Sequence, residues 1–315
     1  MQGIAGDKML AHIGRVAGDH RPITADIFLT NYCNNRCPYC TYRRWDLEGG
    51  AYSMTLAEFK TYTERLRALG VLGFILTGGG EPTVAPDFPA IAGWLESQGL
   101  HYGVNELHFI KPDYLKVSLD GWDEDSYEWR RGVRRYDTVR ENIQRYASWK
   151  EEHSPGTSLG VQCVVESVGD VLKFYQANHG LKVDYMVFRP KESTGGKAYS
   201  GEAGKVIASS IIRAVNELAA QDPRVVLNFK WHLLGTQETS CVASWAQIAL
   251  NERGEVMYCC HKPYQVIGHV LDEDILEKKA AAVTDMRTCD IPCRMTAPNA
   301  FVARTMAERK DVCFI

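Results

Sequence analysis

An α/β fold with a parallel sheet is predicted from two patterns that alternate between residues 23 and 191. Short, nearly continuous apolar runs are typical of strands that are buried on both faces of a sheet. Between these runs, apolar residues recur at helical spacing, as at Leu56, Phe59, Leu66 and Leu69, with charged residues between them. Strands and helices that alternate in this way form a parallel sheet, and in barrels of this kind the strand ends carry the functional site.

Six strand units follow from these patterns. The expected strands are Ala25–Thr30, Gly73–Thr77, Tyr102–Asn105, Leu115–Leu119, Leu159–Val165 and Tyr185–Arg189. The expected helices are Leu56–Leu69, Phe88–Gln98, Tyr136–Lys150 and Val168–Asn178. Only about ten residues separate the third strand from the fourth, so we expect a short turn and a thin or open wall there.

The second part of the chain predicts a smaller α+β unit. Residues 191–204 are rich in Gly, Ser and Lys and indicate a linker or an active-site loop, which a helix over Gly204–Ala220 follows. Three strands are expected to form a small antiparallel element, at Val225–Lys230, Ala246–Leu250 and Glu255–Cys259. Asn251–Gly254 is a hairpin-turn signal between the last two strands. We therefore expect one domain over residues 1–195 and a second over residues 196–315.

The composition narrows the class of protein. The chain has 315 residues, 45% of them hydrophobic, which is enough for a full globular core. Its net charge of -3 and pI near 6.3 argue against nucleic acid or an anionic membrane as a partner. No apolar run approaches about 18 residues, and Met1–His20 has no apolar segment of the secretory type. Ten cysteines without an export signal indicate metal or redox chemistry in a reducing, cytoplasmic compartment.

Three cysteines lie within eight residues, directly after the first expected strand. They are Cys33, Cys37 and Cys40, in the spacing C-x3-C-x2-C. Three thiols this close cannot all pair as disulfides, but their thiolates can converge on one soft metal centre. No fourth cysteine is nearby, and a 4Fe–4S cluster held by three cysteines keeps one iron open for a non-protein ligand. A structural zinc knuckle, or three incidental cysteines, is the alternative interpretation.

A glycine-rich turn with one acid follows the second expected strand. It consists of Gly78, Gly79, Gly80 and Glu81, and its glycines allow the backbone to approach a ligand closely. The turn lacks the Lys-Ser/Thr pair of a phosphate-binding P-loop. Together, the cysteine spacing and this turn resemble the radical S-adenosylmethionine (radical SAM) superfamily.

That resemblance covers residues 20–295 and implies a partial (β/α)6 barrel with a 4Fe–4S cluster on Cys33, Cys37 and Cys40. In the family, the amino and carboxylate groups of SAM chelate the open iron. An electron from the cluster then cleaves SAM to a 5′-deoxyadenosyl radical, which abstracts a hydrogen atom from a substrate carbon. The carbonyls of the Gly78–Gly80 turn and the acid of Glu81 would contact the amino group of SAM.

Looser matches to the family lie elsewhere in the barrel. Tyr39 corresponds to an aromatic residue near the adenine, and Ser118 and Asp120 close the fourth strand, where the family contacts the ribose of SAM. Arg130 and Arg131 follow, where a guanidinium could pair with the SAM carboxylate. The alternative for both arginines is a solvated helix face.

A second group of cysteines resembles the SPASM/Twitch appendage of radical SAM enzymes. Cys241 and Cys259 frame a C-x12-G-x4-C pattern around Gly254, and Cys289 and Cys293 follow. The C-x2-C-x5-C-x3-C run of a full SPASM set is absent, so the one-cluster Twitch version fits better. The resemblance therefore implies a second 4Fe–4S cluster on these four cysteines, with a four-cysteine zinc site as the alternative.

Three cysteines remain. Cys163 lies in an apolar run and is expected to be a core thiol, and Cys313 is close to the end of the chain. Cys260 directly follows a proposed ligand and precedes His261 and Lys262, a setting that favours reactivity. It could be a fifth ligand, a core residue or a working thiol.

The favoured reaction is epimerisation of a carbohydrate or aminoglycoside-type natural product, with Cys260 as the catalytic hydrogen donor. The first alternative is a dehydrogenase, in which the auxiliary cluster takes the second electron. The second is a maturase that crosslinks a ribosomal peptide, which we rank lower because the 32 residues before Cys33 are too few for a leader-binding domain. Epimerisation of a peptide remains open. An iron–sulfur protein without enzymatic activity is the remaining possibility. A reducing partner such as flavodoxin or ferredoxin is expected.

Overall fold

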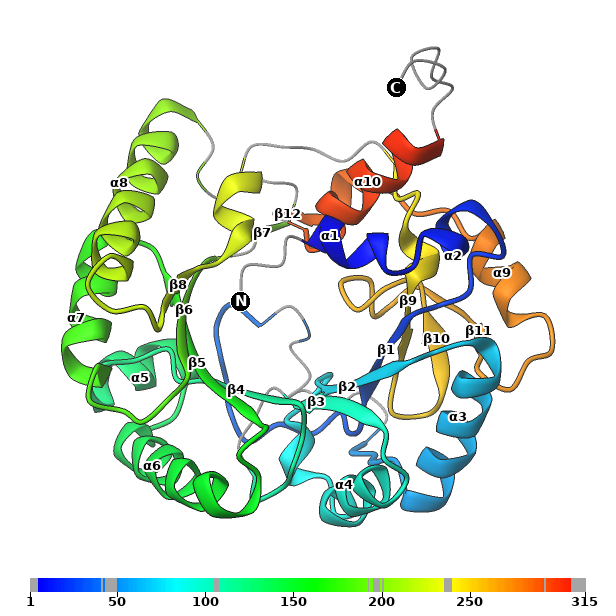
Figure 1. Ribbon diagram of the computed structural model, residues 1–315, viewed down its shortest axis with the longest axis horizontal. Helices are drawn as coiled ribbons and strands as arrows, with labels where there is room; N and C mark the ends of the chain where they lie inside the picture. Colours follow the sequence, from blue (N-terminus) through cyan, green and yellow to red (C-terminus); the bar gives the residue numbers. More distant parts are fainter. Residues whose placement is uncertain are drawn as a thin grey trace.

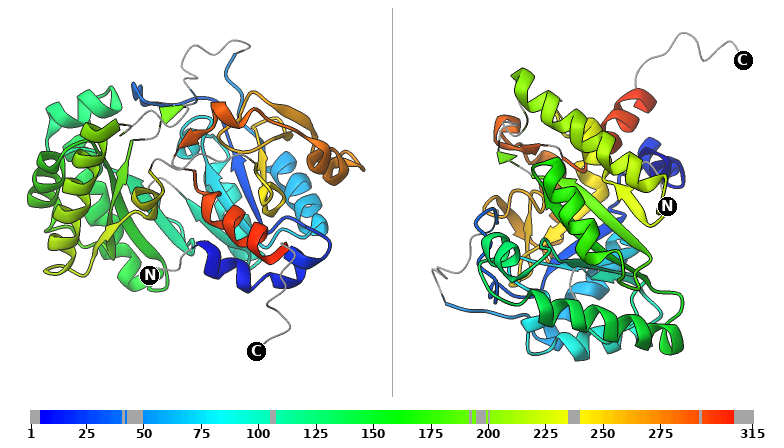
Figure 2. Two further views of the ribbon diagram at one scale, coloured as in Figure 1. Left: turned by 90° about the horizontal axis from the view of Figure 1, so that it is seen from above. Right: turned by 90° about the vertical axis from the view of Figure 1, so that its left-hand side faces the viewer.

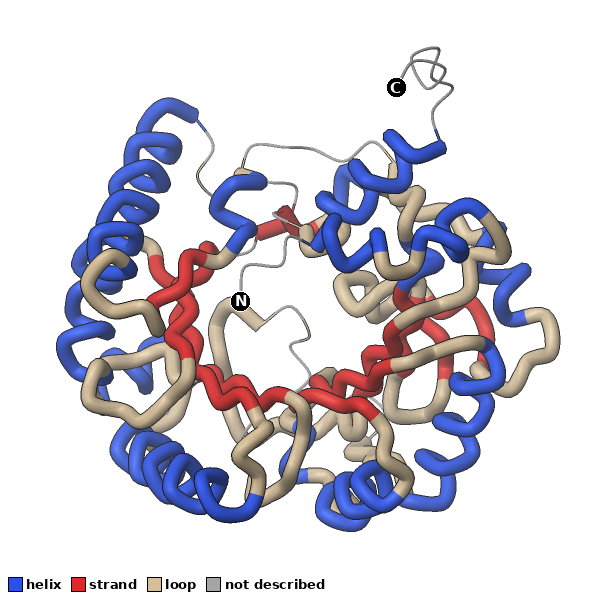
Figure 3. The backbone as a smooth tube through the Cα atoms, viewed as in Figure 1, coloured by secondary structure: helices blue, strands red, loops and turns tan. Residues whose placement is uncertain are grey.

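A curved sheet with helices on its outer side forms the frame of the protein in the computed structural model (Figures 1 and 3). The structure describes residues 5–40, 42, 50–104, 108–191, 193–194, 199, 201–234, 240–291 and 293–306. Ten strands form the sheet in the order β11-β10-β9-β1-β2-β3-β4-β5-β6-β8. The arc is open on one side, as a partial barrel requires.

The parallel sheet that the sequence predicts is present. Strands β1 to β6 pair in chain order, and every pairing among them is parallel. Their bounds are Thr24–Phe28 (β1), Gly73–Thr77 (β2), His101–Val104 (β3), Tyr114–Ser118 (β4), Ser158–Val165 (β5) and Tyr185–Pro190 (β6). Asn105, the expected last residue of the third strand, lies outside the described residues. Between β3 and β4, residues 108–113 contain no helix, as expected for a short connection.

Amphipathic helices cover the outer face of the arc. Their bounds are Leu56–Leu69 (α3), Phe88–Ser97 (α4), Glu124–Arg131 (α5), Tyr136–His153 (α6), Val168–Asn178 (α7) and Gly201–Ala219 (α8). Helix α5 is not among the helices that the sequence pattern predicts. Side-chain caps define several of these helix starts, and α3 and α7 each begin with a capping box, formed by Thr55 with Glu58 and by Ser167 with Asp170. Each cap satisfies backbone donors that a helix leaves unpaired at its N-terminus.

The main core fills the space between the sheet and these helices. Alternate residues of β1, such as Ala25 and Ile27, are fully buried there together with Leu76 and Val117 of neighbouring strands. The other residues of β1, Asp26 among them, therefore face the inside of the arc.

The prediction of a small antiparallel element is wrong for its first strand. Strand β8 (Val225–Leu227) pairs with β6 in parallel and extends the barrel sheet at that edge. The strand stops before Lys230, because Asn228 accepts a hydrogen bond from the Lys230 amide (3.0 Å) and caps a 3-10 helix, η3 (Phe229–Leu233). Trp231 on this turn donates to the Phe188 carbonyl (3.0 Å), which fixes it against β6.

The other two expected strands continue the sheet beyond β1. Strand β9 (Gln247–Leu250) pairs with β1 in parallel and with β10 (Glu255–Met257) in antiparallel orientation, and β11 (Val266–His269) follows β10. The predicted hairpin over Asn251–Gly254 is present, with a positive φ of 78° at Gly254. Residues after 196 therefore supply both edges of the one large sheet.

Small elements complete the fold. A two-stranded antiparallel sheet joins β7 (Ser193–Thr194) to β12 (Asp290–Ile291) across the open side of the arc (Figure 1). Helices α1 (Ala5–Leu10) and α2 (Ile13–Ala17) contact α10 (Thr296–Met306), as Figure 2 shows. The remaining elements are α9 (Ile275–Ala281) and the 3-10 helices η2 (Pro82–Val84), η4 (Ser244–Ala246) and η5 (Met286–Thr288). No described helix is long and apolar enough to cross a membrane.

Candidate functional site

The three closely spaced cysteines share a pocket with the glycine-rich turn. The pocket has a volume of about 230 Å³ and is bordered by Thr77 of β2, by Lys116 and Ser118 of β4 and by Gln162 of β5. Its lining includes Cys33, Cys37, Cys40, Gly78, Gly79, Gly80, Lys116, Ser118, Arg131 and Gln162. The structure thus brings together the predicted cluster ligands and most of the residues predicted to contact SAM.

The glycine turn packs backbone against backbone on the cysteine loop. The Gly80 amide donates to the Thr30 carbonyl (2.8 Å), and the Glu81 amide donates to the Tyr32 carbonyl (2.8 Å). A Cβ on Gly80 would lie 1.9 Å from the Tyr32 carbonyl oxygen, and one on Gly78 would lie 1.9 Å from the Gly80 carbonyl oxygen. Only glycine fits at these two positions, because the obstacle in each case is backbone.

Glu81 itself points away from this pocket. Its carboxylate accepts hydrogen bonds from the Thr83 amide (3.1 Å) and the Thr83 hydroxyl (2.7 Å), and so caps η2. The side chain is buried and lines a neighbouring pocket that also contains Asn34 and Asn35. Because this carboxylate already has two donors, its local role is to hold the turn.

Asp120 acts as the anchor of the cysteine loop. It is buried with a left-handed backbone (φ 46°), a conformation that favours a short polar side chain. Its carboxylate accepts from the Tyr39 hydroxyl (3.0 Å), the Val164 amide (2.8 Å) and Arg131 (3.4 Å). Burial, and then the charge of Asp120, raise the pKa of Tyr39 far above its usual range, so the phenol stays neutral and donates.

The two arginines have different positions, and neither lies on a solvated helix face. Arg130 is 2% exposed; it donates to the Val164 carbonyl and forms an ion pair with Asp170 (3.1 Å). Its guanidinium also lies over the rings of Trp122 and Trp129. Arg131 is 9% exposed and lines the cysteine pocket. Of the pair, therefore, Arg131 is the one placed to meet a bound carboxylate.

The thiols of this pocket suit a metal that takes thiolate ligands. Burial raises the pKa of Cys37 to about 12 and also raises the pKa of Cys33. Without a bound metal the buried thiols therefore stay protonated, whereas a coordinated metal would compensate the thiolate charge. Three thiols, an open pocket and a close glycine backbone fit a cluster that leaves one site for a further ligand.

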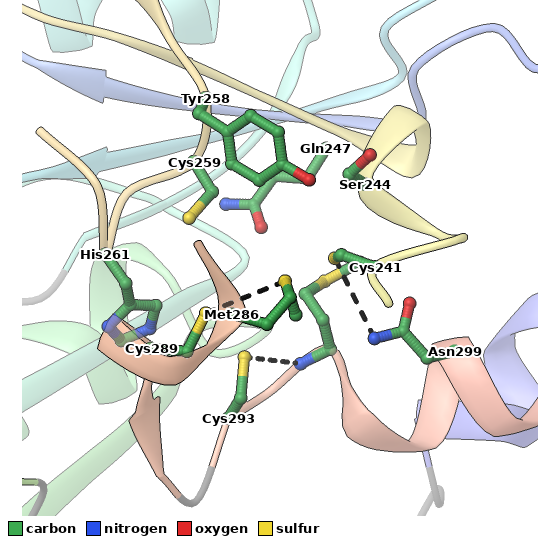
Figure 4. A pocket seen from close by; sticks show the side chains of 11 residues that line it. Cys241, Ser244, Gln247, Tyr258, Cys259, His261, Met286, Cys289, Cys293 and Asn299 are labelled. Atoms are coloured by element: carbon green, nitrogen blue, oxygen red, sulfur yellow. Dashed lines mark hydrogen bonds between the residues drawn. The ribbon is translucent and has the colours of Figure 1, made fainter. Parts of the chain in front are cut away.

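The second group of cysteines lines a separate pocket. Cys241, Cys259, Cys289 and Cys293 face a shared space (Figure 4). The β9–β10 hairpin brings Cys259 toward Cys241, and the strand β12 lies between Cys289 and Cys293. Backbone and amide donors reach two of the sulfurs: Met295 N to Cys293 Sγ (3.4 Å) and Asn299 Nδ2 to Cys241 Sγ (3.8 Å). Among the described residues, no three His, Cys, Asp or Glu side chains are arranged to hold a single metal ion.

Cys260 does not join this group. It is 6% exposed and packs with Phe28, Ala249 and Met257, which form a small cluster inside the arc. Its sulfur accepts a hydrogen bond from Arg294 Nη2 (3.0 Å), and the same nitrogen forms an ion pair with Asp26. Cys259 and Cys260 are adjacent in the chain but contact different clusters, as expected for neighbours in an extended segment.

Two residues of this arrangement were missed from the sequence, namely Asp26 and Arg294. Asp26 is an acid inside an apolar strand, and that signal alone could have marked it as functional. Cys163 is fully buried in the core between sheet and helices, as expected for a core thiol. Cys313 lies outside the described residues.

Comparison with known proteins supports the family expected from the motifs. The model of the radical SAM superfamily matches residues 27–149. This segment of the chain is similar to the radical SAM superfamily. It includes the three-cysteine loop, the glycine turn and Asp120. A radical SAM domain binds SAM and an iron–sulfur cluster, which agrees with the donor set of the first pocket.

Curated proteins are similar to part of this chain. A segment of 100 residues is 29% identical to the 5-amino-6-(D-ribitylamino)uracil–L-tyrosine 4-hydroxyphenyl transferase of Synechocystis sp., covering 32% of this chain and 23% of that protein. The matches to curated relatives span at most 39% of those proteins' own length.

Solved structures resemble a larger part of the chain. Streptococcus suis SuiB bound to the precursor peptide SuiA superposes with a TM-score of 0.62 at 14% identity, covering 86% of this chain and 67% of that one. Native anSMEcpe with bound AdoMet gives a TM-score of 0.59 at 13% identity, covering 93% of this chain and 87% of that one. At these identities the likeness shows a shared fold.

Proposed function

We propose that this radical SAM protein is an epimerase that removes a hydrogen atom from a substrate carbon and returns another from the Cys260 thiol. The observation that carries the proposal is the position of Cys260. Its thiol lies inside the arc, apart from the four-cysteine pocket, and contacts Arg294 at 3.0 Å.

In this proposal, Cys33, Cys37 and Cys40 hold the 4Fe–4S cluster, which together with SAM supplies a 5′-deoxyadenosyl radical when both are bound. The Gly78–Gly80 turn gives the SAM amino group a close backbone surface. Arg131 and Ser118 line the same pocket and would meet the carboxylate and ribose. Asp120 and Tyr39 hold the loop from behind.

The four cysteines Cys241, Cys259, Cys289 and Cys293 would hold the second 4Fe–4S cluster. Burial raises the pKa of Cys241 to about 11, and that of Cys259 still higher. As in the first pocket, buried thiols that stay protonated in the metal-free protein suit a metal that replaces their protons.

In the proposed reaction, Cys260 returns a hydrogen atom to the substrate carbon. Loss of a hydrogen atom to the 5′-deoxyadenosyl radical leaves a carbon radical and 5′-deoxyadenosine. The Cys260 S–H bond then breaks, a C–H bond forms on the opposite face, and a thiyl radical remains. That radical regains one electron and one proton before the next turnover, and a reducing protein such as flavodoxin or ferredoxin would supply the electron.

We infer a polar substrate, because polar side chains face the inside of the arc. Lys116 and Gln162 line the cysteine pocket, and Asp26 and Gln247 lie on adjacent strands. Carbohydrates and aminoglycosides offer the hydroxyl and amino groups that such side chains bind. A peptide substrate is the second candidate, which is favoured by the fold shared with SuiB bound to its precursor peptide.

Turnover in deuterium oxide tests the proposal. The wild-type enzyme should place one deuterium at the inverted carbon, because a thiol proton exchanges with solvent before donation. Cys260→Ala should still form 5′-deoxyadenosine but no inverted product. Cys163→Ala, which removes a core thiol facing the helices, is the matched control and should still invert the substrate.

Two results would contradict the proposal. A product two mass units lighter without solvent label would identify a dehydrogenase. Inversion that survives Cys260→Ala would exclude this thiol as the donor.

A further inference from the structure

We propose that Arg294, held by Asp26, is a positioning residue that fixes the direction of the Cys260 thiol. This inference rests on the proposed role of Cys260 as hydrogen donor. It names two residues that no sequence motif marked, one on the barrel strand β1 and one directly after the predicted ligand Cys293.

The geometry joins three separate segments at one nitrogen. Arg294 Nη2 donates to Cys260 Sγ at 3.0 Å and forms an ion pair with Asp26 Oδ2. Gln247 Nε2 donates to the same carboxylate oxygen from β9. One guanidinium nitrogen has two N–H bonds, so it can serve the sulfur and the carboxylate together.

The pair is strongly held because Asp26 is fully buried. Its Oδ1 atom has no hydrogen-bond partner among the described residues. The buried carboxylate is therefore stabilised through Oδ2, by Arg294 and Gln247. Removing one partner of a buried ion pair leaves an uncompensated charge, which is why such pairs resist displacement.

The donated hydrogen bond has a direct consequence for the thiol. A lone pair of Sγ is directed at the guanidinium, so the S–H hydrogen must point elsewhere. Phe28, Ala249 and Met257 around the thiol are apolar, and the Tyr42 hydroxyl that packs beside them donates to the Cys260 carbonyl (3.0 Å). An arginine suits this role because it stays charged at every physiological pH and its planar fork keeps its orientation.

Without the guanidinium, the Cys260 side chain can rotate among three staggered positions. The fraction with a productive S–H direction should then fall to about one third, which raises the ratio of 5′-deoxyadenosine to inverted product about threefold or more. Arg294 does not act on SAM cleavage in this proposal, so the rate of 5′-deoxyadenosine formation should stay unchanged.

The test compares Arg294→Met, Arg294→Lys and Asp26→Asn in the reconstituted enzyme. Arg287→Met is the matched control, because Arg287 is an exposed arginine in the same segment and pairs with Asp285. Arg294→Met should raise the ratio about threefold or more with an unchanged iron content, and Arg294→Lys should lie between it and the wild type. Asp26→Asn should raise the ratio as well. This variant tests the Asp26–Arg294 pair by a change on β1, whereas Arg294 directly follows the predicted ligand Cys293. The control should keep the wild-type ratio.

A crystal structure of Arg294→Met supplies a readout that does not depend on the reaction. The structure of Arg294→Met should show Cys260 in more than one rotamer. If Arg294→Met does not fold, a crystal structure of Asp26→Asn takes its place. A single unchanged rotamer, an unchanged ratio, or the loss of about four irons would overturn the positioning role. If the wild-type enzyme gives no inverted product, the proposed epimerase function fails, and the rotamers still decide whether Arg294 orients the thiol.

Discussion

Gly80 has no room for a side chain, because a Cβ there would lie 1.9 Å from the Tyr32 carbonyl oxygen. Gly80→Ala should therefore displace the cysteine loop and prevent loading of the first cluster. We expect the reconstituted variant to lose about four of about eight irons and all SAM cleavage.

Gly73→Ala is the control for that change. Gly73 starts the same strand, β2, and a Cβ there meets nothing within 4 Å. It should keep the iron content and SAM cleavage of the wild type. Full iron loading in Gly80→Ala would show that the turn can move away from the loop.

Arg130 is a residue whose role lies in the fold rather than at the SAM pocket. Replacing it with Met should lower the free energy of unfolding by about 1.5–3 kcal/mol, because Asp170 would lose its charged partner but keep the Glu166 and Ser167 amides as donors. Chemical denaturation measures the change. Arg134→Ala, which removes exposed pairs with Asp125 and Glu128, should leave the unfolding midpoint nearly unchanged. Equal midpoints for both variants would contradict this role.

Helix α9 places Lys279 beside the four-cysteine pocket. Lys279 is 5% exposed, its Nζ donates to the Tyr258 carbonyl (3.1 Å), and burial lowers its pKa to about 8. In the unfolded chain Lys279 keeps its proton up to about pH 10.4. Burying the charged ammonium therefore lowers the free energy of unfolding by its full amount below pH 8, and this cost disappears as the pH rises toward 10.

Lys279→Met in the metal-free protein tests this point. Relative to that variant, the wild type should gain up to about 3 kcal/mol of unfolding free energy between pH 7 and pH 10. Urea unfolding at both pH values measures the difference in unfolding free energy between the wild type and Lys279→Met. Taking this difference cancels the titration of groups that both proteins share. A difference that stays constant would mean that Lys279 keeps its ordinary pKa.

Elements with a strong local pattern could be predicted from the sequence. Strand β2 and helices α3 and α7 begin and end at the predicted residues, because apolar spacing and caps are local. The pairing of β8 with β6 could not be predicted, since a short apolar run does not reveal its neighbour. The first cysteine pocket followed from spacing, whereas the Asp26–Arg294–Cys260 contact joins residues that only the fold brings together.

The sheet makes the described chain one structural unit. Strand β8 pairs with β6, and β9 pairs with β1, so residues after 196 extend the barrel sheet at both of its edges. We expect the metal-free protein to unfold in one cooperative transition that fluorescence and circular dichroism report together. Two separate transitions would instead support independent domains over residues 1–195 and 196–315.

The central claim is that the three-cysteine loop holds the cluster that cleaves SAM. The most direct measurement is 5′-deoxyadenosine formation after anaerobic reconstitution, in the wild type and in the variant with Cys33, Cys37 and Cys40 changed to Ala. The wild type should carry about eight irons and form 5′-deoxyadenosine, whereas the variant should keep about four irons and form none. Formation of 5′-deoxyadenosine by the variant would contradict the account.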